Sequence, residues 1–340
     1  MEKINISIVG CGAHSHLHAN AAAAFPEVTI TSCCDIDSSR SKIWADKYKC
    51  RDYTNITEMI NSEKPDAVIL CTWPNQHLEQ IKECLTAGIK NILCEKSLTI
   101  TSKDAFEIRD LVNSYGAYLM EGCMFRHHPA IRKVEELAFS SCLGKIDSIR
   151  ASFSNYEPEA HKDKLNSQDW RYRKECGGGV THDWMSYCVN AANYFSGSEP
   201  LTIFASGNHN KDYDVIDRVF SQISYENGIA AFIESSKHAN FTQMLHISCA
   251  NGIIQLPVAW GIYGDIFINV LHRKEKWGYI MADRYEIEEA DSFMLQLKNF
   301  LDVMKGKSKP LVSLDESVRN IHTVELIIQS ITEKKSVSFS

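Results

Sequence analysis

The sequence contains no uncharged apolar run that approaches the roughly 18 residues of a membrane-spanning helix. Residues 1–12 lack the long apolar segment and the small-residue cleavage site of a signal peptide, and we expect them to form a strand that runs into a turn. Low-complexity linkers and internal repeats are absent as well. These features predict a cytoplasmic globular protein that has no membrane partner.

Cysteine pairs at C-x-x-C spacing and an excess of positive charge are also missing. None of the 12 cysteines forms a C-x-x-C pair, and several of them, such as Cys33 and Cys94, lie on or beside apolar runs. This placement favours buried, reduced thiols over disulfides. The formal net charge is -7 and the pI is near 6.0, so the sequence gives no basic surface for nucleic acid.

The chain is long enough to form two hydrophobic cores. Its 340 residues exceed one ordinary domain, and 44% apolar with 23% charged residues is a globular composition. Up to about residue 125, apolar runs alternate with amphipathic stretches, which predicts β-α units on a doubly wound parallel sheet. The expected strands are 4–9, 28–34, around 52–53, 67–72, 91–94 and 117–120, and the expected helices are 13–24, 38–48, 75–87 and 102–115.

After residue 125 the pattern changes. Helices are expected at 130–139 and 180–195, and again near the C-terminus at 292–304 and 314–333. Strand-like runs between residues 203 and 256 are joined by turns that contain Asn-Gly pairs, which favour hairpins. We therefore predict an α/β protein with a Rossmann domain over residues 1–125 and an α+β domain with a mostly antiparallel sheet over residues 126–340.

The turn after the first expected strand has a dinucleotide-binding pattern. Gly10 and Gly12 match the first two glycines of G-x-G-x-x-G, and Ser15 replaces the third. The next helix is expected to begin at Ala13, and the exposed backbone N–H groups of Ala13 and His14 would suit a pyrophosphate. We therefore expect a nicotinamide dinucleotide at this turn.

Asp35 indicates which dinucleotide is preferred. It lies 20 residues after Ser15, at the end of the second strand, where a carboxylate accepts hydrogen bonds from the ribose hydroxyls and repels a 2′-phosphate. NAD is therefore expected in preference to NADP. The alternative for Asp35 is a helix cap, and Arg40 has three possible roles: it holds a phosphate, stacks on adenine or lies in solvent.

Three histidines, His14, His16 and His18, raise the question of a metal site. On a helix, a two-residue spacing spreads the side chains around the axis, and no carboxylate or cysteine completes a ligand set at this spacing. We expect no metal here. The three side chains are predicted to line the phosphate turn and the helix surface.

Lys96 follows Glu95 directly after the strand at 91–94, where a bound nicotinamide would present its reactive face. The segment that ends the expected strand 67–72 and follows it is expected to form the wall beside the nicotinamide. His77 would lie at the start of the next helix. An N-capped helix with a buried aromatic is the alternative interpretation of this segment. The predicted wall consists of Thr72, Trp73, Pro74 and Asn75.

Several motifs occur in an order that resembles one family. They are residues 10–15, 67–77 (AVILCTWPNQH), 95–96 (EK), 126–129 (RHHP), 170–171 (WR), 177–179 (GGG) and Asp183. Along nearly the whole chain, this order is similar to that of the Gfo/Idh/MocA oxidoreductases (glucose–fructose oxidoreductase, inositol dehydrogenase). The resemblance implies a Rossmann domain and a second domain, residues 126–340, that has an open-faced sheet, helps to bind a sugar or polyol between the domains, and forms dimers or tetramers.

The chain departs from the family's motifs at two positions. Ser97 replaces the proline that follows the family's lysine, which leaves the turn less constrained. Tyr187 replaces the acid/base histidine of the D-x-x-x-H motif that begins at Asp183. We expect Lys96 to polarise the reacting oxygen and to lower the pKa of the Tyr187 phenol from roughly 10, so that this phenol exchanges the proton.

On the predicted helix 180–195, Asp183 and Tyr187 are four residues apart and therefore lie on one face, where Asp183 is expected to hold a sugar hydroxyl or pair with Lys96. His182 is the alternative acid/base if the helix starts late. The expected activity is that of an NAD-dependent dehydrogenase or ketoreductase of a sugar, glycoside or cyclic polyol. A sugar–sugar oxidoreductase that retains its NAD and a non-catalytic dinucleotide sensor are the alternatives. Further candidates for substrate contact are Arg126, Tyr156, Trp170 and Arg171.

Overall fold

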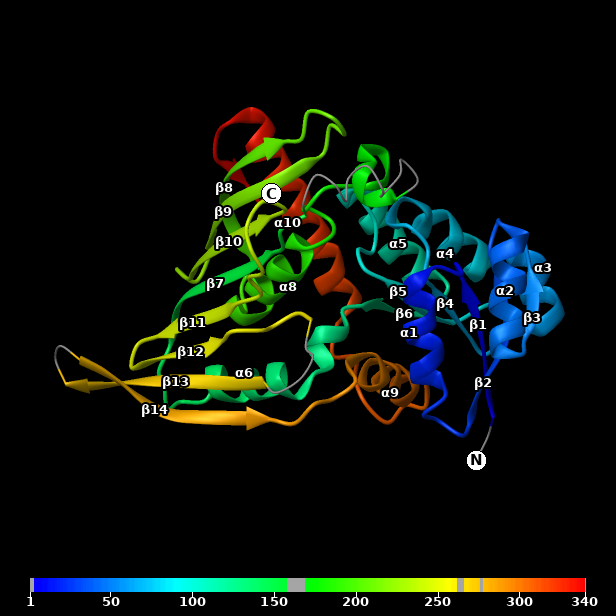
Figure 1. Cartoon of the computed structure of the whole chain (residues 1–340), viewed down its shortest axis with the longest axis horizontal. Coiled ribbons are helices and arrows are strands. Elements are labelled where there is room, and N and C mark those ends of the chain that lie inside the picture. The colour runs from blue at the N-terminus through cyan, green and yellow to red at the C-terminus, as the bar shows by residue number, and fades with distance from the viewer. Residues whose placement is uncertain (1–2, 158–168, 262–265, 276–277, 340) are drawn as a thin grey trace. The chain divides into compact units, whose positions relative to one another are not determined.

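The structure, a computed structural model, describes residues 3–157, 169–261, 266–275 and 278–339 (Figure 1). The chain divides into two compact units, one formed by Met1–His127 with Asp291–Val318 and the other by His128–Ala290 with Arg319–Ser340. This division differs in one main respect from the predicted domain boundary at residue 125. Residues 291–318 belong to the first unit because helix α9 (Ser292–Met304) packs against helix α1 (Ala13–Ala22).

The first unit contains a parallel six-stranded sheet with the strand order β3-β2-β1-β4-β5-β6, which confirms the predicted Rossmann architecture. The order reverses between β1 and β4, and in open α/β sheets the ligand-binding crevice lies at this reversal, beyond the carboxyl ends of the strands. The strands are β1 (Ile4–Val9), β2 (Val28–Cys34), β3 (Arg51–Tyr53), β4 (Ala67–Leu70), β5 (Asn91–Glu95) and β6 (Tyr118–Gly122).

Except for the short, exposed β3, the strands of this sheet are largely apolar and lie between helices. Ile6, Ile8 and Leu93 are wholly buried, as expected for a parallel sheet that helices cover. One helix, α3, was not predicted, although the Asn55 side chain caps it by accepting a 2.8 Å hydrogen bond from the Glu58 amide. Besides α1 and α9, the helices are α2 (Ser38–Tyr48), α3 (Ile56–Glu63), α4 (His77–Thr86) and α5 (Ser102–Ser114).

The second unit contains a nine-stranded sheet with the order β14-β13-β12-β11-β7-β10-β9-β8-β15. Among the described strands of this sheet, only the β7–β10 pair is parallel, so the prediction of a mostly antiparallel sheet is confirmed. The strands are β7 (Ile146–Ser154), β8 (Pro200–His209), β9 (Ile216–Tyr225), β10 (Ala230–Ser236), β11 (Leu245–Cys249), β12 (Gly252–Leu256), β13 (Ile266–Glu275), β14 (Gly278–Ile287) and β15 (Val337–Ser338).

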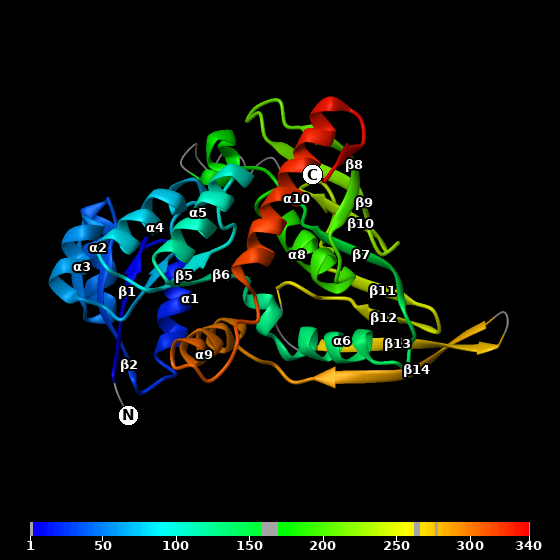
Figure 2. The same cartoon turned by 180° about the vertical axis from the view of Figure 1, so that it is seen from behind.

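Helices cover one face of this sheet (Figures 1 and 2). They are α6 (Pro129–Phe139), α8 (Met185–Ser196) and the part of α10 (Leu314–Glu333) from Arg319 onward. On the opposite face, Phe204, Phe220 and Phe232 project from three neighbouring strands and are 50%, 49% and 41% exposed. The sheet is therefore open-faced, as the sequence resemblance implied.

None of the helices in the described ranges combines the length and apolar character that a bilayer crossing demands. The expected cytoplasmic location stays a prediction.

Candidate active site

The glycine turn at the end of β1 fits a dinucleotide. Gly10 has φ +89°, and an added Cβ would lie 2.8 Å from the Cys71 carbonyl oxygen, so only glycine is tolerated there. An added Cβ on Gly12 would meet no heavy atom within 4 Å, and Gly12 is exposed. The first glycine therefore packs the turn against the end of β4, and the second leaves an open approach to its backbone.

The start of α1 offers donors to an anion. Gly12 is the N-cap, no side chain caps the helix, and the first turn contains no acidic residue. The N–H groups at Ala13 and His14 therefore lie at a helix end that suits a pyrophosphate. The Ser15 hydroxyl is not exposed to this site, because it is fully buried, donates to the Gly12 carbonyl at 2.6 Å and accepts from Trp44 Nε1 at 2.9 Å.

Asp35 is held beside the same turn by two backbone amides. Its Oδ2 accepts a 2.8 Å hydrogen bond from Cys11 N, and its Oδ1 accepts a 2.9 Å bond from Asp37 N. The helix-cap alternative is wrong, because Asp37 caps α2 by accepting from Ser39 N and Arg40 N. Each Asp35 oxygen keeps a further lone pair that suits a ribose hydroxyl.

Two exposed neighbours flank Asp35 on the side of α2. The Arg40 side chain is 59% exposed, and its Nε lies 3.5 Å from Asp37 Oδ2. Asp37 therefore offsets part of the charge that Arg40 would offer to a phosphate. Ile36 is 89% exposed and adds only apolar surface.

The three histidines of α1 lie in different environments. His14 is half-buried, and the His16 ring packs on Trp44 while its Nδ1 lies 2.9 Å from Tyr48 Oη. His18 is fully buried, which differs from the predicted place on the helix surface. Within the described ranges, no group of three or more metal-ligating side chains is arranged to hold an ion.

Lys96 lies at the carboxyl end of β5 and is half-buried. The preceding Glu95, which we also expected to lie beside the cofactor, is 6% exposed. Its Oε1 lies 2.7 Å from His18 Nε2, and its Oε2 accepts from the Lys96 amide at 3.3 Å. Burial alone would raise the pKa of Glu95, but the hydrogen bond and positive charge of His18, with His14 and Lys96, hold this pKa at about 2.

Two further buried side chains hold the loop after Lys96. His77 was predicted to lie beside the cofactor, but it is fully buried, with Nδ1 3.1 Å from Ser97 O and 3.0 Å from Leu98 O, and Nε2 3.2 Å from Thr72 O. Glu121 accepts from the Leu98 amide at 2.8 Å. Both residues therefore fix the backbone beyond Lys96. The Lys96–Ser97 peptide bond is cis.

The predicted nicotinamide wall follows β4. Thr72 and Trp73 are half-buried, Pro74 is buried at the start of the short helix η1 (Pro74–Gln76), and Asn75 is exposed. The Thr72 hydroxyl donates to Gln80 Oε1, while its methyl group lies 2.9 Å from an added Cβ at Gly10. The wall and the glycine turn therefore meet at the reversal between β1 and β4.

Replacing His18 with alanine should lower turnover about tenfold and the free energy of unfolding by about 2 kcal/mol, because the buried Glu95 carboxylate loses a hydrogen bond to a charged acceptor. His18→Gln keeps an N–H donor and should recover most of both losses. Steady-state kinetics and denaturant unfolding measure these effects. His16→Ala, on the same helix, is the matched control and should leave turnover within twofold; equal damage in the glutamine and alanine variants would contradict this role of His18.

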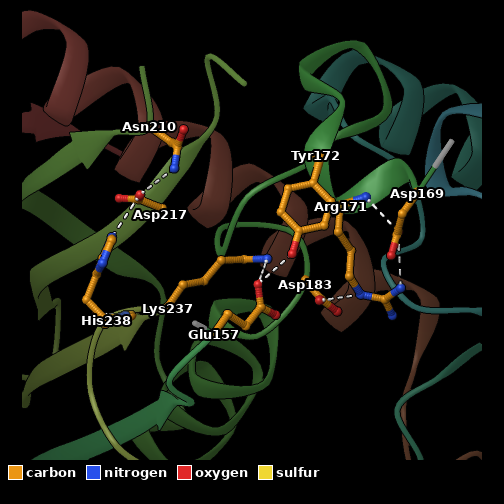
Figure 3. A network of polar contacts seen from close by, with 10 residues as sticks. Glu157, Asp169, Arg171, Tyr172, Asp183, Asn210, Asp217, Lys237 and His238 are labelled. Atoms are coloured by element: carbon orange, nitrogen blue, oxygen red, sulfur yellow. Dashed lines mark hydrogen bonds and ion pairs between the residues drawn. The ribbon is translucent and has the colours of Figure 1, made fainter. Parts of the chain in front are cut away.

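In the second unit, Asp183 forms an ion pair that the sequence did not predict (Figure 3). Its Oδ2 accepts a 2.8 Å hydrogen bond from Arg171 Nε, and Arg171 also contacts Asp169. Asp183 is 2% exposed, so the arginine provides the charge that its burial requires. Arg171 is therefore placed to hold Asp183, in addition to its predicted contact with substrate.

Helix α8 starts at Met185, five residues later than predicted. Asp183 therefore lies in the turn before the helix, and Trp184 is the N-cap, so the argument that Asp183 and Tyr187 share one helix face is wrong. Tyr187 lies in the first turn. Its ring meets Phe153 edge-on at 5.4 Å, and it lies 6.3 Å from the Trp260 ring.

The remaining predicted substrate residues divide into buried and exposed ones. Arg126 is fully buried and donates to Glu316 Oε1 and the Leu311 carbonyl at 3.1 Å, within the first unit. Trp170 is 8% exposed beneath the Arg171 guanidinium, and His182 is 4% exposed beside Thr181. Tyr156 is 57% exposed.

Comparison with known proteins agrees with this fold. Residues 4–123 match the oxidoreductase family described by its NAD-binding Rossmann fold, and residues 131–255 match the Gfo/Idh/MocA C-terminal domain. D-xylose 1-dehydrogenase (NADP(+)) 2 of Haloferax volcanii is 24% identical over 96% of this chain and 95% of that protein. The dTDP-3,4-didehydro-2,6-dideoxy-alpha-D-glucose 3-reductase of Actinomadura kijaniata is 28% identical over 95% of this chain and 94% of that protein.

A solved structure gives the same result for the fold. The crystal structure of a 3-ketoreductase from Actinomadura kijaniata in complex with NADP and TDP-benzene is 21% identical, covers 97% of this chain and 98% of its own, and has a TM-score of 0.85. The resemblance seen in the sequence motifs is thus confirmed along both parts of the chain. The chain belongs to the Gfo/Idh/MocA family and is an NAD(P)-dependent oxidoreductase.

Proposed function

We propose that the protein is an NAD-dependent dehydrogenase or ketoreductase that acts on a secondary alcohol or ketone of a sugar, glycoside or cyclic polyol. One observation carries this proposal. Lys96 stands at the carboxyl end of β5, and the carboxylate behind it is bound to α1, the helix whose N-terminus forms the dinucleotide turn. The relatives that act on xylose and on a deoxysugar nucleotide support the substrate class.

In this proposal each residue has a distinct role. The nicotinamide, when bound, supplies the group that accepts or donates hydride. The Lys96 ammonium polarises the reacting oxygen and favours the phenolate of Tyr187, which exchanges the hydroxyl proton. Asp183, oriented by Arg171, accepts a hydrogen bond from a neighbouring substrate hydroxyl. His182 is the alternative acid/base.

Screening hexoses, inositols, glycosides and nucleotide sugars with NAD and NADP separately tests the activity. We expect reduction of NAD by at least one of these classes. Tight dinucleotide binding without turnover across the panel would favour a sensor, and dinucleotide absorbance already present in the purified protein would favour a sugar–sugar oxidoreductase.

Asp35 is proposed to make the protein prefer NAD. Replacing Asp35 with serine removes a carboxylate that accepts ribose hydrogen bonds and repels a 2′-phosphate, so the ratio of the NADP to the NAD dissociation constants should fall at least about tenfold. Fluorescence titration with both dinucleotides at one ionic strength measures this ratio. Asp37→Ser is the matched control and should leave the ratio unchanged; equal affinities of the wild type for both dinucleotides would contradict the proposal.

We also propose that the open face of the nine-stranded sheet binds a second copy of the chain. Three exposed phenylalanines project from β8, β9 and β10 and, with Arg150 of β7, line a hollow of about 430 Å³. Contiguous exposed apolar surface of this kind marks an association surface. Light scattering should give the mass of a dimer or larger assembly of the 38.5 kDa chain, and the mass of a single chain would contradict the proposal.

A further inference from the structure

Lys237 is a buried cation in the second unit (Figure 3). It follows the last residue of β10 and is only 3% exposed. Its Nζ lies 2.9 Å from Glu157 Oε2, 4.5 Å from the centroid of the Tyr172 ring and 5.2 Å from that of the Trp184 ring. Tyr172 Oη donates to the same Glu157 oxygen at 2.7 Å.

Such a pair is costly to bury. Removing an ammonium from water costs several kcal/mol, which one carboxylate and two aromatic faces only partly offset. An apolar side chain of similar length would fill the same space without that cost. The chain also contains an exposed pair with similar geometry, Lys174 Nζ to Asp214 Oδ2 at 2.6 Å, with side chains 67% and 66% exposed.

A short series of contacts leads from Lys237 to Tyr187. Trp184 lies beneath the Lys237 ammonium and stacks on Phe153, with centroids 5.5 Å apart and an angle of 15°. The Phe153 ring in turn meets Tyr187 edge-on. Trp184 is also the N-cap of α8, and Asp183 directly precedes it. The position of the Trp184 ring therefore affects both residues assigned to the substrate.

We propose that the Lys237–Glu157 pair positions the first turn of α8, and with it Asp183 and Tyr187, by holding the Trp184 ring. Lys237 is thus a positioning residue that does not contact the substrate itself. Its effect on turnover rests on the proposed function, whereas its effect on α8 does not. Glu157 fixes the ammonium through the ion pair, and the ammonium in turn lies against the Tyr172 and Trp184 rings.

Hydrogen exchange in the full-length protein tests the effect on α8 without a substrate. Lys237→Met keeps the aliphatic stem and removes the charge, and the amides of Met185 and Tyr187, which bond to Val180 O and Trp184 O, should exchange at least about tenfold faster. Lys237→Arg keeps the cation and should restore slow exchange. Lys174→Met is the matched control and should exchange as the wild type does.

A double variant separates positioning from stability. Lys237→Met with Glu157→Gln leaves no uncompensated charge, so its melting temperature should recover toward that of the wild type. The α8 amides should still exchange fast, because no cation holds Trp184. If Lys237→Met alone fails to fold, Trp184→Leu keeps the ion pair, removes the ring and should also speed exchange in α8. Wild-type exchange in the double variant or in Trp184→Leu would overturn the proposal.

Turnover links this effect to the reaction. With the compound that gives turnover in the screen, the double variant should lose about tenfold in kcat, while the dissociation constant for NAD, measured by fluorescence, stays within twofold. Tyr187→Phe separates the proposed role of Tyr187 in the reaction from the proposed positioning role of Lys237. If Tyr187→Phe is fully active, the assignment of Tyr187 fails while the exchange result stands. If Tyr187→Phe is inactive and the double variant keeps its kcat, only the positioning proposal fails.

Discussion

Replacing Lys96 with methionine is expected to lower turnover by about 1,000-fold and to leave the dissociation constant for NAD within about threefold of the wild-type value. Methionine fills a similar volume but neither polarises the reacting oxygen nor favours a phenolate, and the loss of a positioned charge in an active site has this magnitude. The glycine turn and Asp35, proposed to bind the dinucleotide, are unchanged. Steady-state kinetics and NAD titration measure the two quantities.

The control for Lys96 lies at the other end of the same strand. Lys90 is exposed, precedes β5 and donates to the Tyr115 carbonyl, so Lys90→Met alters the charge of the protein equally but should leave turnover within twofold. Turnover of Lys96→Met within tenfold of the wild-type rate would contradict the assignment. Loss of NAD binding in that variant would instead assign Lys96 to the cofactor site alone.

Replacing Tyr187 with phenylalanine is expected to lower kcat by about 100-fold, since the variant keeps the ring and loses the hydroxyl that exchanges the substrate proton. The ring contacts with Phe153 and Trp260 remain, so the melting temperature should change little. The pH profile of kcat should also lose the limb that reports the phenol. Kinetics across pH and thermal unfolding measure these effects.

Two comparisons make the Tyr187 test specific. Tyr194→Phe removes a hydroxyl from the same helix and should leave kcat unchanged. His182→Gln tests the alternative acid/base, because a large loss there with an active Tyr187→Phe would move the role to His182. A kcat for Tyr187→Phe within threefold of the wild-type value would refute the role of the phenol.

Most strands of the first unit were predictable because they are short, largely apolar runs that end in a turn or helix start, whereas β3, which is Arg-Asp-Tyr, has no apolar run. In the second unit, β13 and β14 were missed, although Ile266, Ile268 and Val270 alternate with less buried residues and could have revealed β13. The start of α8 was placed too early. Residues 181–184 are polar or aromatic and fit a helical pattern. The Val180 amide, however, donates a hydrogen bond to the Ile216 carbonyl in β9 and holds this segment outside the helix.

For the candidate site, position along the chain led us to propose Lys96, Asp35 and the glycine turn, because each follows a strand at the edge where open α/β sheets bind ligands. Contacts between residues that are distant along the chain could not be predicted from the sequence alone. His18 and Glu95 are 77 residues apart, and Lys237 and Glu157 are 80 apart, so only the folded chain brings them together. Arg126 belongs to a family motif, but its partner Glu316, 190 residues away, holds it in the interior.

Transfer of deuterium from substrate to nicotinamide tests the central claim most directly. Hexoses, inositols and glycosides deuterated at their carbinol carbons would be incubated with the protein and NAD, and the reduced dinucleotide would be analysed by mass spectrometry. We expect the reduced nicotinamide from at least one compound to carry one deuterium, and Lys96→Met to give almost none. Saturable NAD binding with no label transferred from any compound would contradict the account.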